Sequence, residues 1–111
     1  MGHKTFIGEF EQTLLLSILQ LDDGAYAPNI ARHLDATIGR SVSRGALYSC
    51  LNQLERKGFL RWRLDDPTPN RGGHSRRFYQ VTPRGVHALR ASRERLLTLW
   101  QGLESVLGLA K

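Results

Sequence analysis

The sequence predicts a mostly helical α+β fold with short helices, one two-stranded hairpin and a long last helix. Apolar residues recur at helical spacing over 7–21, over 43–57 and from Val86 onward. The spacing changes to a period of two over 59–64 and 78–82, which predicts the hairpin. A length of 111 residues with 41% hydrophobic content suits one globular domain with a small core.

The first two predicted helices are short. Residues 7–21 carry a wide apolar stripe, with Thr5 as a candidate cap, and an Asp-Asp-Gly sequence at 22–24 ends the helix. A second helix is predicted over 27–36, with Pro28 in its first turn. The width of the first stripe indicates two neighbours, the protein's own core and a second surface.

The third predicted helix has one apolar face and one polar face. Its buried stripe consists of Leu47, Leu51 and Leu54, with Cys50 beside it. The opposite face offers hydroxyls, amides and an arginine, which suit phosphates and the edges of bases. Two short helices joined in this way, followed by a hairpin, predict a winged helix-turn-helix with a two-stranded wing.

The two strands of the predicted wing follow Gly58. Between them, residues 66–75 are turn formers and polar groups, which predicts a long wing tip. On the returning strand Tyr79 is interpreted as a packing residue, and Trp62 as a core residue of the first strand. Gly58 and Gly85 are interpreted as requirements of turns.

Thr82-Pro83 predicts the start of the last helix. Its apolar positions follow a 3-4-3-4 seam that would continue for about 25 residues, or roughly 37 Å. A domain this small cannot cover the whole seam, so we predict a homodimer in which residues 1–82 form the winged domain and 83–111 the dimerisation helix. The expected interface is Ile7, Phe10, Leu14, Val86, Leu89, Leu96, Trp100, Leu103 and Leu107.

Positive charge is concentrated in one third of the chain. Between Arg40 and Arg77 there are nine basic and three acidic residues, an excess equal to the whole net charge of +6. Such segregation favours a polyanionic partner, and double-stranded DNA fits the predicted fold. The alternative is a solvated basic face without a partner.

Other classes of site and protein are not indicated. Cys50 is the only cysteine, which excludes an intrachain disulfide and a multi-thiolate metal site and predicts a cytoplasmic protein. Cys50 is interpreted as a core residue, with a redox-sensitive thiol as the alternative. Neither a metal nor another cofactor is expected, and the absence of a nucleophile elbow or phosphate loop argues against an enzyme. No apolar run is long enough to span a membrane, and no signal peptide is apparent.

Two motifs resemble the PadR family of bacterial transcriptional regulators, in its short form with a single C-terminal helix. They are SRGALY at 43–48 and RRFYQVTPRG at 76–85. Together with the leucine-rich first helix, the resemblance covers residues 7 to 90. It implies a winged helix-turn-helix, a homodimer and a repressor of nearby genes. Ser49 departs from the family, in which proline is common at this position, and Pro28 follows an altered glycine-tyrosine pair.

The main hypothesis is a repressor that binds a roughly palindromic operator. Ser49, Asn52 and Gln53 are expected to face bases, and Tyr48 either meets the DNA backbone or covers the core. The predicted DNA-binding residues are Ser43, Arg44, Tyr48, Ser49, Asn52, Gln53, Lys57, Arg71, His74, Arg76 and Arg77. Arg76 and Arg77 fall on opposite strand faces, so at most one of them is expected to face DNA. The alternative function is a winged-helix module that binds an acidic protein without reading DNA.

Trp100 suggests an effector site. A tryptophan at a seam position near a two-fold axis meets its symmetry mate, and two such rings can stack or separate. The resemblance implies that they would hold a planar aromatic effector, with Leu97, Leu14 and Ile18 lining the channel. The alternative is that Trp100 only fills the interface.

Overall fold

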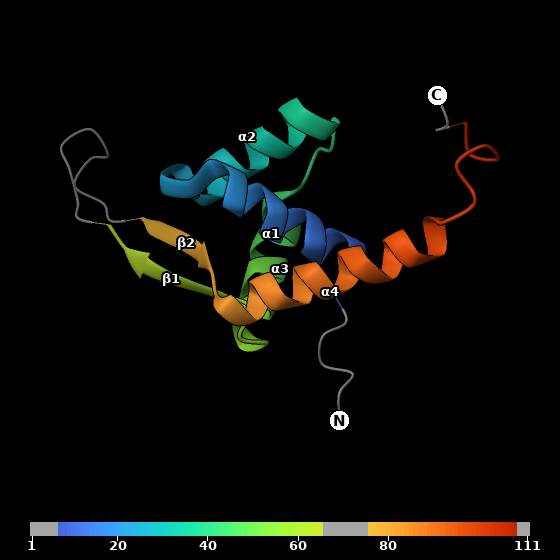
Figure 1. Ribbon diagram of the computed structural model, residues 1–111. Helices are drawn as coiled ribbons and strands as arrows, with labels where there is room; N and C mark the ends of the chain where they lie inside the picture. Colours follow the sequence, from blue (N-terminus) through green and yellow to red (C-terminus); the bar gives the residue numbers. More distant parts are fainter. Residues whose placement is uncertain (1–6, 66–75, 109–111) are drawn as a thin grey trace.

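The computed structural model describes residues 7–65 and 76–108. Its elements in chain order are α1 (Glu9–Leu21), the 3-10 turn η2 (Asp22–Gly24), α2 (Ala27–Ile38), α3 (Arg44–Arg56), β1 (Leu60–Leu64), β2 (Arg77–Val81) and α4 (Pro83–Trp100). Two helices followed by an antiparallel hairpin confirm the predicted winged helix-turn-helix (Figure 1). The predicted wing tip and the candidate cap Thr5 lie outside the described residues.

Helix α1 lies at the centre of the fold, in contact with α2, α3, α4 and β2. Leu14 and Ile18 are buried in the core, with 0% and 2% of their surface exposed. They therefore cannot line a surface between protomers or an effector channel, as the sequence analysis expected. The exposed leucines of α1 are Leu16 and Leu19, at 48% and 46%. The helix packs one edge of its wide apolar stripe inward and leaves the other edge uncovered.

Helix α3 begins and ends close to the predicted positions. The Ser43 hydroxyl accepts a hydrogen bond from the backbone N–H of Ala46 at 3.1 Å, which caps the first turn. Leu47, Leu51 and Leu54 are buried as predicted. Because this face is anchored in the core, the polar face of α3 points away from the protein.

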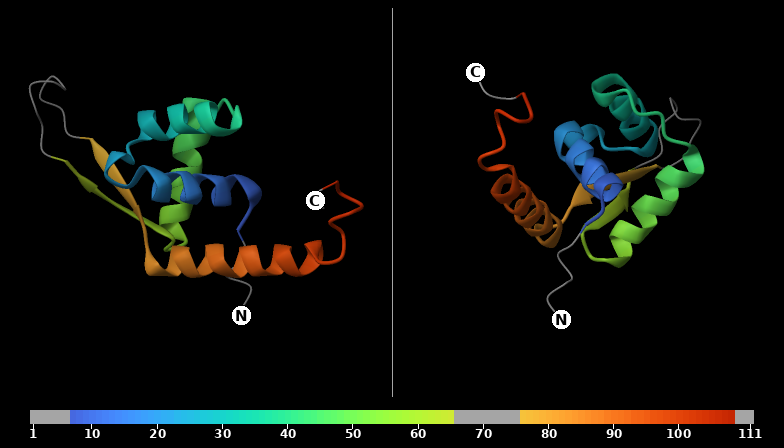
Figure 2. Two further views of the ribbon diagram at one scale, coloured as in Figure 1. Left: turned by 45° about the horizontal axis from the view of Figure 1, so that its top comes forward. Right: turned by 90° about the vertical axis from the view of Figure 1, so that its right-hand side faces the viewer.

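The wing projects from one end of the helical body (Figure 2). In its antiparallel register Trp62 pairs with Tyr79, and Leu64 pairs with Arg77. Tyr79 is buried, and its backbone N–H donates to the carbonyl of Ala25 at 3.0 Å. This bond fastens the root of the wing to the segment that enters α2, so the wing and the helix-turn-helix form one unit.

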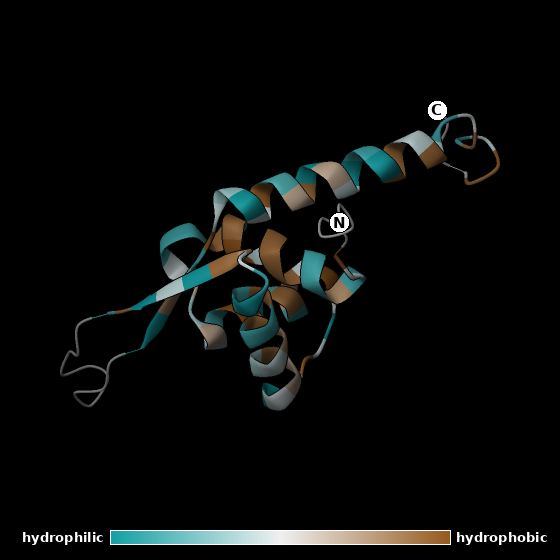
Figure 3. Cartoon of the chain, turned by 90° about the horizontal axis from the view of Figure 1, so that it is seen from below, coloured by the Kyte–Doolittle hydropathy of each residue, from teal (hydrophilic) through white to brown (hydrophobic). Residues whose placement is uncertain are grey.

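Helix α4 has 18 residues, a length of about 27 Å. It is shorter than predicted because Gln101, with φ −57° and ψ 132°, leaves the helical conformation, and Gly102, with a φ of 81°, completes a turn in which the Leu103 N–H donates to the Trp100 carbonyl at 3.0 Å. Leu103 and Leu107 therefore lie in the turns after the helix and do not extend its apolar seam. The second half of α4 still extends beyond the other helices (Figure 3).

Cys50 packs in the core and is 8% exposed. Burial raises the pKa of its thiol to about 11, with the Glu11 carboxylate adding to the shift and Lys57 opposing it. The thiol is thus protonated at neutral pH, which argues against a redox-sensitive cysteine.

We expect native Cys50 to react with a thiol-specific reagent at pH 8 far more slowly than the unfolded chain. Because burial favours the neutral thiol, its contribution to stability should fall as the pH rises from 9 towards 11. Stopped-flow absorbance of the reagent measures the rate, and denaturant unfolding across this pH range measures the stability. Fast, complete labelling of the native protein would contradict the assignment, and Cys50→Ala should lose less stability over this range than the wild type, since the raised pKa values of Tyr26 and Tyr79 still contribute.

Candidate nucleic-acid interface

The outer face of α3 is polar and open to solvent. Arg44, Ser49, Asn52 and Gln53 are all exposed, as the helical period predicts. These side chains offer donors and acceptors that can reach phosphates and base edges. Ser43 is exposed too, but its hydroxyl caps the helix.

The wing root and α3 meet around Tyr48. This half-buried tyrosine lines a hollow of about 280 Å³ together with Arg76 and Arg77, and an adjoining hollow of about 260 Å³ with Arg44. Both hollows also include Ala27 and Pro28 at the start of α2. Both wing arginines line the first hollow, and the expectation that at most one of them faces DNA stays a prediction.

Both wing arginines are stacked on aromatic rings. The guanidinium carbon of Arg76 lies 3.8 Å from the centre of the Tyr26 ring, and that of Arg77 lies 4.1 Å from the Trp62 ring. Stacking uses the flat face of a guanidinium and leaves the N–H groups at its edge for phosphate oxygens. The wing root therefore presents two ordered cations next to α3.

The wing root is also tied to the body by Asp65. The Tyr26 hydroxyl donates to its carboxylate, and this hydrogen bond, together with burial, raises the pKa of Tyr26. Arg63 forms an ion pair with Asp65 at 3.0 Å. Because Asp65 balances the charge of Arg63, the net positive charge of the wing root is lower than the number of its arginines indicates.

Lys57 does not lie free for a phosphate, contrary to the prediction. Its Nζ donates to both carboxylate oxygens of Glu11, at 2.9 and 2.7 Å. The Glu11 side chain is only 12% exposed, so the pair is partly shielded from water. Arg71 and His74, also predicted to contact DNA, lie outside the described residues.

A second feature lies between α1 and α4, apart from the two hollows around Tyr48. An apolar groove of about 490 Å³ runs between α1 and α4. Its lining residues are Gln12, Leu16, Leu19, Val86, Leu89, Arg90, Arg93, Leu96 and Leu97. Four of the predicted interface or effector residues, Val86, Leu89, Leu96 and Leu97, are thus brought together there. Trp100 lies one turn further along α4 and is 41% exposed.

Metal binding finds no support in residues 7–65 and 76–108, where no three His, Cys, Asp or Glu side chains are grouped to hold an ion. In the same ranges no helix has the length and apolar character needed to cross a bilayer.

The arrangement of α2, α3 and the wing defines a winged helix-turn-helix protein with a basic wing root. The sequence model described as "Transcriptional regulator PadR-like family" matches residues 15–91, and the chain belongs to this family. Family members are transcriptional regulators that bind DNA, and not enzymes. No curated protein matches the chain at a significant level.

Solved structures of PadR regulators share the fold. One is a PadR-like transcription factor from Bacteroides fragilis, with 27% identity, a TM-score of 0.62 and coverage of 91% of this chain and 89% of that chain. A second, from Eggerthella lenta, has 26% identity, a TM-score of 0.67 and coverage of 89% and 86%. A third, from Clostridium difficile, covers 88% and 98% with a TM-score of 0.67, and at 20% identity it shows the fold alone.

Proposed function

We propose that this protein is a homodimeric repressor that acts in the cytoplasm and binds a roughly palindromic operator in double-stranded DNA. The observation that carries the proposal is the continuous surface formed by the polar face of α3, Tyr48 and the stacked arginines of the wing. Family membership supplies the class of partner.

The surface suggests a division of roles. Ser49, Asn52 and Gln53 are exposed on α3 and would read base edges in the major groove. Arg44 and Tyr48 lie beside the wing root and would contact the phosphate backbone. Lys57 is not included, because Glu11 already occupies its ammonium group.

The dimer is proposed from the apolar surface that one protomer leaves open. Leu16 and Leu19 on α1 face Leu96 and Leu97 on α4 across the groove, and each is about half exposed. Exposed apolar patches of this kind mark interaction surfaces. A two-fold pair would present two α3 helices to DNA and would therefore bind a palindromic operator with half-sites one helical turn apart, roughly 34 Å.

The same groove is the proposed effector site. Its walls are apolar, and Arg90 and Arg93 lie at its edge, so a planar aromatic molecule with an acidic group would fit better than a cation. Trp100, one turn beyond Leu96, would stack on such a ligand in the dimer, or else it fills the interface. Binding there would relieve repression by changing how the protomers pack.

A titration of genomic DNA fragments tests the proposal. Selected fragments should bind more tightly than random DNA, and binding should weaken steeply with salt because phosphates are neutralised. Absence of any preference among DNA sequences at low salt would overturn the proposal. It would favour the alternative of a winged-helix module that binds an acidic protein.

Two substitutions should separate base reading from phosphate contact. Asn52→Ala is expected to lower the preference for the operator over random DNA by about 1–3 kcal/mol, the value of one good base contact. Arg77→Ala should weaken operator and random DNA alike and reduce the salt slope by about one. Fluorescence anisotropy at several salt concentrations measures both effects.

The matched control for charge is Arg90→Ala, which removes one arginine from the α1–α4 groove and should leave the salt slope unchanged. If Asn52→Ala and Arg77→Ala alter specific and random binding in the same way, the roles of α3 and the wing have been assigned wrongly.

A further inference from the structure

The first turn of α1 holds both ends of α3 through ion pairs. Arg40, in the segment that leads into α3, pairs with Glu9 at 2.7 Å. Lys57, the residue directly after α3, pairs with Glu11 at 2.7 Å. The partners are separated by 31 and 46 positions in the sequence. A helix that must present a fixed face to DNA is thus tied to the same neighbouring helix before its start and after its end.

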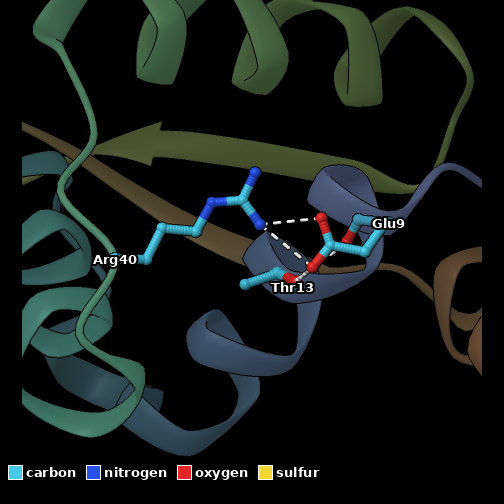
Figure 4. Close-up of polar contacts among 3 residues, drawn as sticks. All are labelled: Glu9, Thr13 and Arg40. Atoms are coloured by element: carbon cyan, nitrogen blue, oxygen red, sulfur yellow. Dashed lines mark hydrogen bonds and ion pairs between the residues drawn. The ribbon is translucent and has the colours of Figure 1, made fainter.

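The pair at the start of α3 is exposed, and Figure 4 shows its contacts. Arg40 Nη1 donates to both carboxylate oxygens of Glu9, at 2.7 and 2.9 Å, and the Thr13 hydroxyl donates to the backbone carbonyl of Glu9 at 2.8 Å, with Glu9 Oε2 3.3 Å away. The guanidinium carbon of Arg40 also lies 4.7 Å from the centre of the Phe10 ring. An exposed ion pair alone contributes little to stability. Its role here is to restrict where the segment before α3 can lie.

The pair at the end of α3 is the more shielded one. Glu11 is 12% exposed and receives two hydrogen bonds from Lys57, and its Oε1 also accepts from the backbone N–H of Gly8 at 2.9 Å. Loss of one partner from such a pair leaves the other charge poorly compensated. The end of α3 would then be free to move relative to α1.

We propose that Glu9 and Glu11 are positioning residues for base reading, which hold α3 at the angle that base contacts require. The inference rests on the proposed function, since it assigns Lys57 to orientation of the reading helix and not to phosphate contact. Base contacts need side chains placed within a few tenths of an ångström. Phosphate contacts made by long, flexible cations tolerate more movement. Loosening α3 should therefore reduce sequence discrimination while leaving non-specific affinity in place.

The competing explanation makes the opposite prediction. If Lys57 grips a phosphate and Glu11 only restrains it, Glu11→Gln would release a cation to DNA. Binding to every sequence would then tighten, and the salt slope would rise by about one.

The test uses Glu11→Gln, Lys57→Met and the exchanged variant Glu11→Lys/Lys57→Glu in the full chain. We expect each single variant to lower the preference for the operator over random DNA by about tenfold, the loss of roughly one base contact, with the salt slope unchanged. The exchanged variant should recover part of the preference, because the ion pair can form again but a lysine at position 11 cannot accept from the Gly8 N–H. Glu94→Gln, which removes an exposed acid from α4, is the control for net charge. A steeper salt slope in Glu11→Gln would overturn the proposal.

Hydrogen exchange of the DNA-free protein provides a readout that does not depend on DNA binding. Amides at the end of α3 and in the following turn, residues 54–59, should exchange faster in Glu11→Gln, and those at 40–46 should do so in Glu9→Gln. Unchanged exchange in both variants would overturn the positioning role even if the protein reads DNA. A wild-type protein without operator preference would instead refute the proposed function, and faster exchange would still support the tie between α1 and α3.

Discussion

Gly85→Ala is expected to destabilise the fold by about 3 kcal/mol or more, at the upper end of what overpacking costs. A Cβ atom at this position would lie 2.4 Å from the carbonyl oxygen of Phe59 and 2.7 Å from Cγ1 of Val81. The carbonyl cannot easily move away, because it accepts a hydrogen bond from the backbone N–H of Thr82 at 3.1 Å. The first turn of α4 would have to separate from the wing. Urea unfolding followed by circular dichroism measures the loss.

Gly45→Ala is the matched control. Gly45 also lies in the first turn of a helix, but no other atom lies within 4 Å of the Cβ that would be added. Alanine favours a helix over glycine by about 1 kcal/mol, so this variant should be as stable as the wild type or more stable. Equal stability of Gly85→Ala and Gly45→Ala would show that α4 does not pack on Phe59 as described.

Local patterns predicted most of the fold. The limits of α3 were predicted within about one residue, since a capping serine and a regular leucine stripe are both local signals. The change of period after Gly58 located the wing in the same way. The length of α4 was overestimated because leucines at seam spacing continue past residue 100, whereas a turn over 100–103 that uses the positive φ of Gly102 ends the helix. Gly85 was interpreted as a requirement of a turn. It is a buried residue of α4, and the nearby carbonyl of Phe59 leaves no room for a side chain there.

Contacts distant in sequence account for what the sequence analysis missed at the site. The polar face of α3 follows from its helical period, and the structure leaves it exposed. Lys57 appeared to be a free cation because its partner Glu11 is 46 residues away. The stripe of α1 is wide enough to bury either edge, so its pattern could not show that Leu14 packs inside while Leu16 remains outside. Only the packing of α1 against its neighbouring helices and β2 determines which edge of the stripe is buried.

Leu16→Glu combined with Leu96→Glu is expected to abolish the dimer. The two leucines lie on opposite walls of the α1–α4 groove and are 48% and 45% exposed in the protomer, so the protomer should still fold. Burying the exposed half of each of two leucines contributes about 1.5–3 kcal/mol per protomer, or about 3–6 kcal/mol for the dimer, which corresponds to at least a hundredfold in the dissociation constant. Glutamates at these positions would also place charges in an apolar interface, which adds to the loss. Sedimentation velocity measures the assembly.

Ile38→Glu is the control for this variant, because Ile38 is 57% exposed at the end of α2 and does not line the groove. It introduces the same kind of charge and should leave the dimer intact. A monomeric double variant should lose most of its operator affinity, since one α3 helix can contact only one half-site. Its remaining DNA binding should show a salt slope about half that of the dimer, because half as many phosphates are neutralised. An intact dimer in Leu16→Glu/Leu96→Glu would place the interface elsewhere and remove the basis for a palindromic operator.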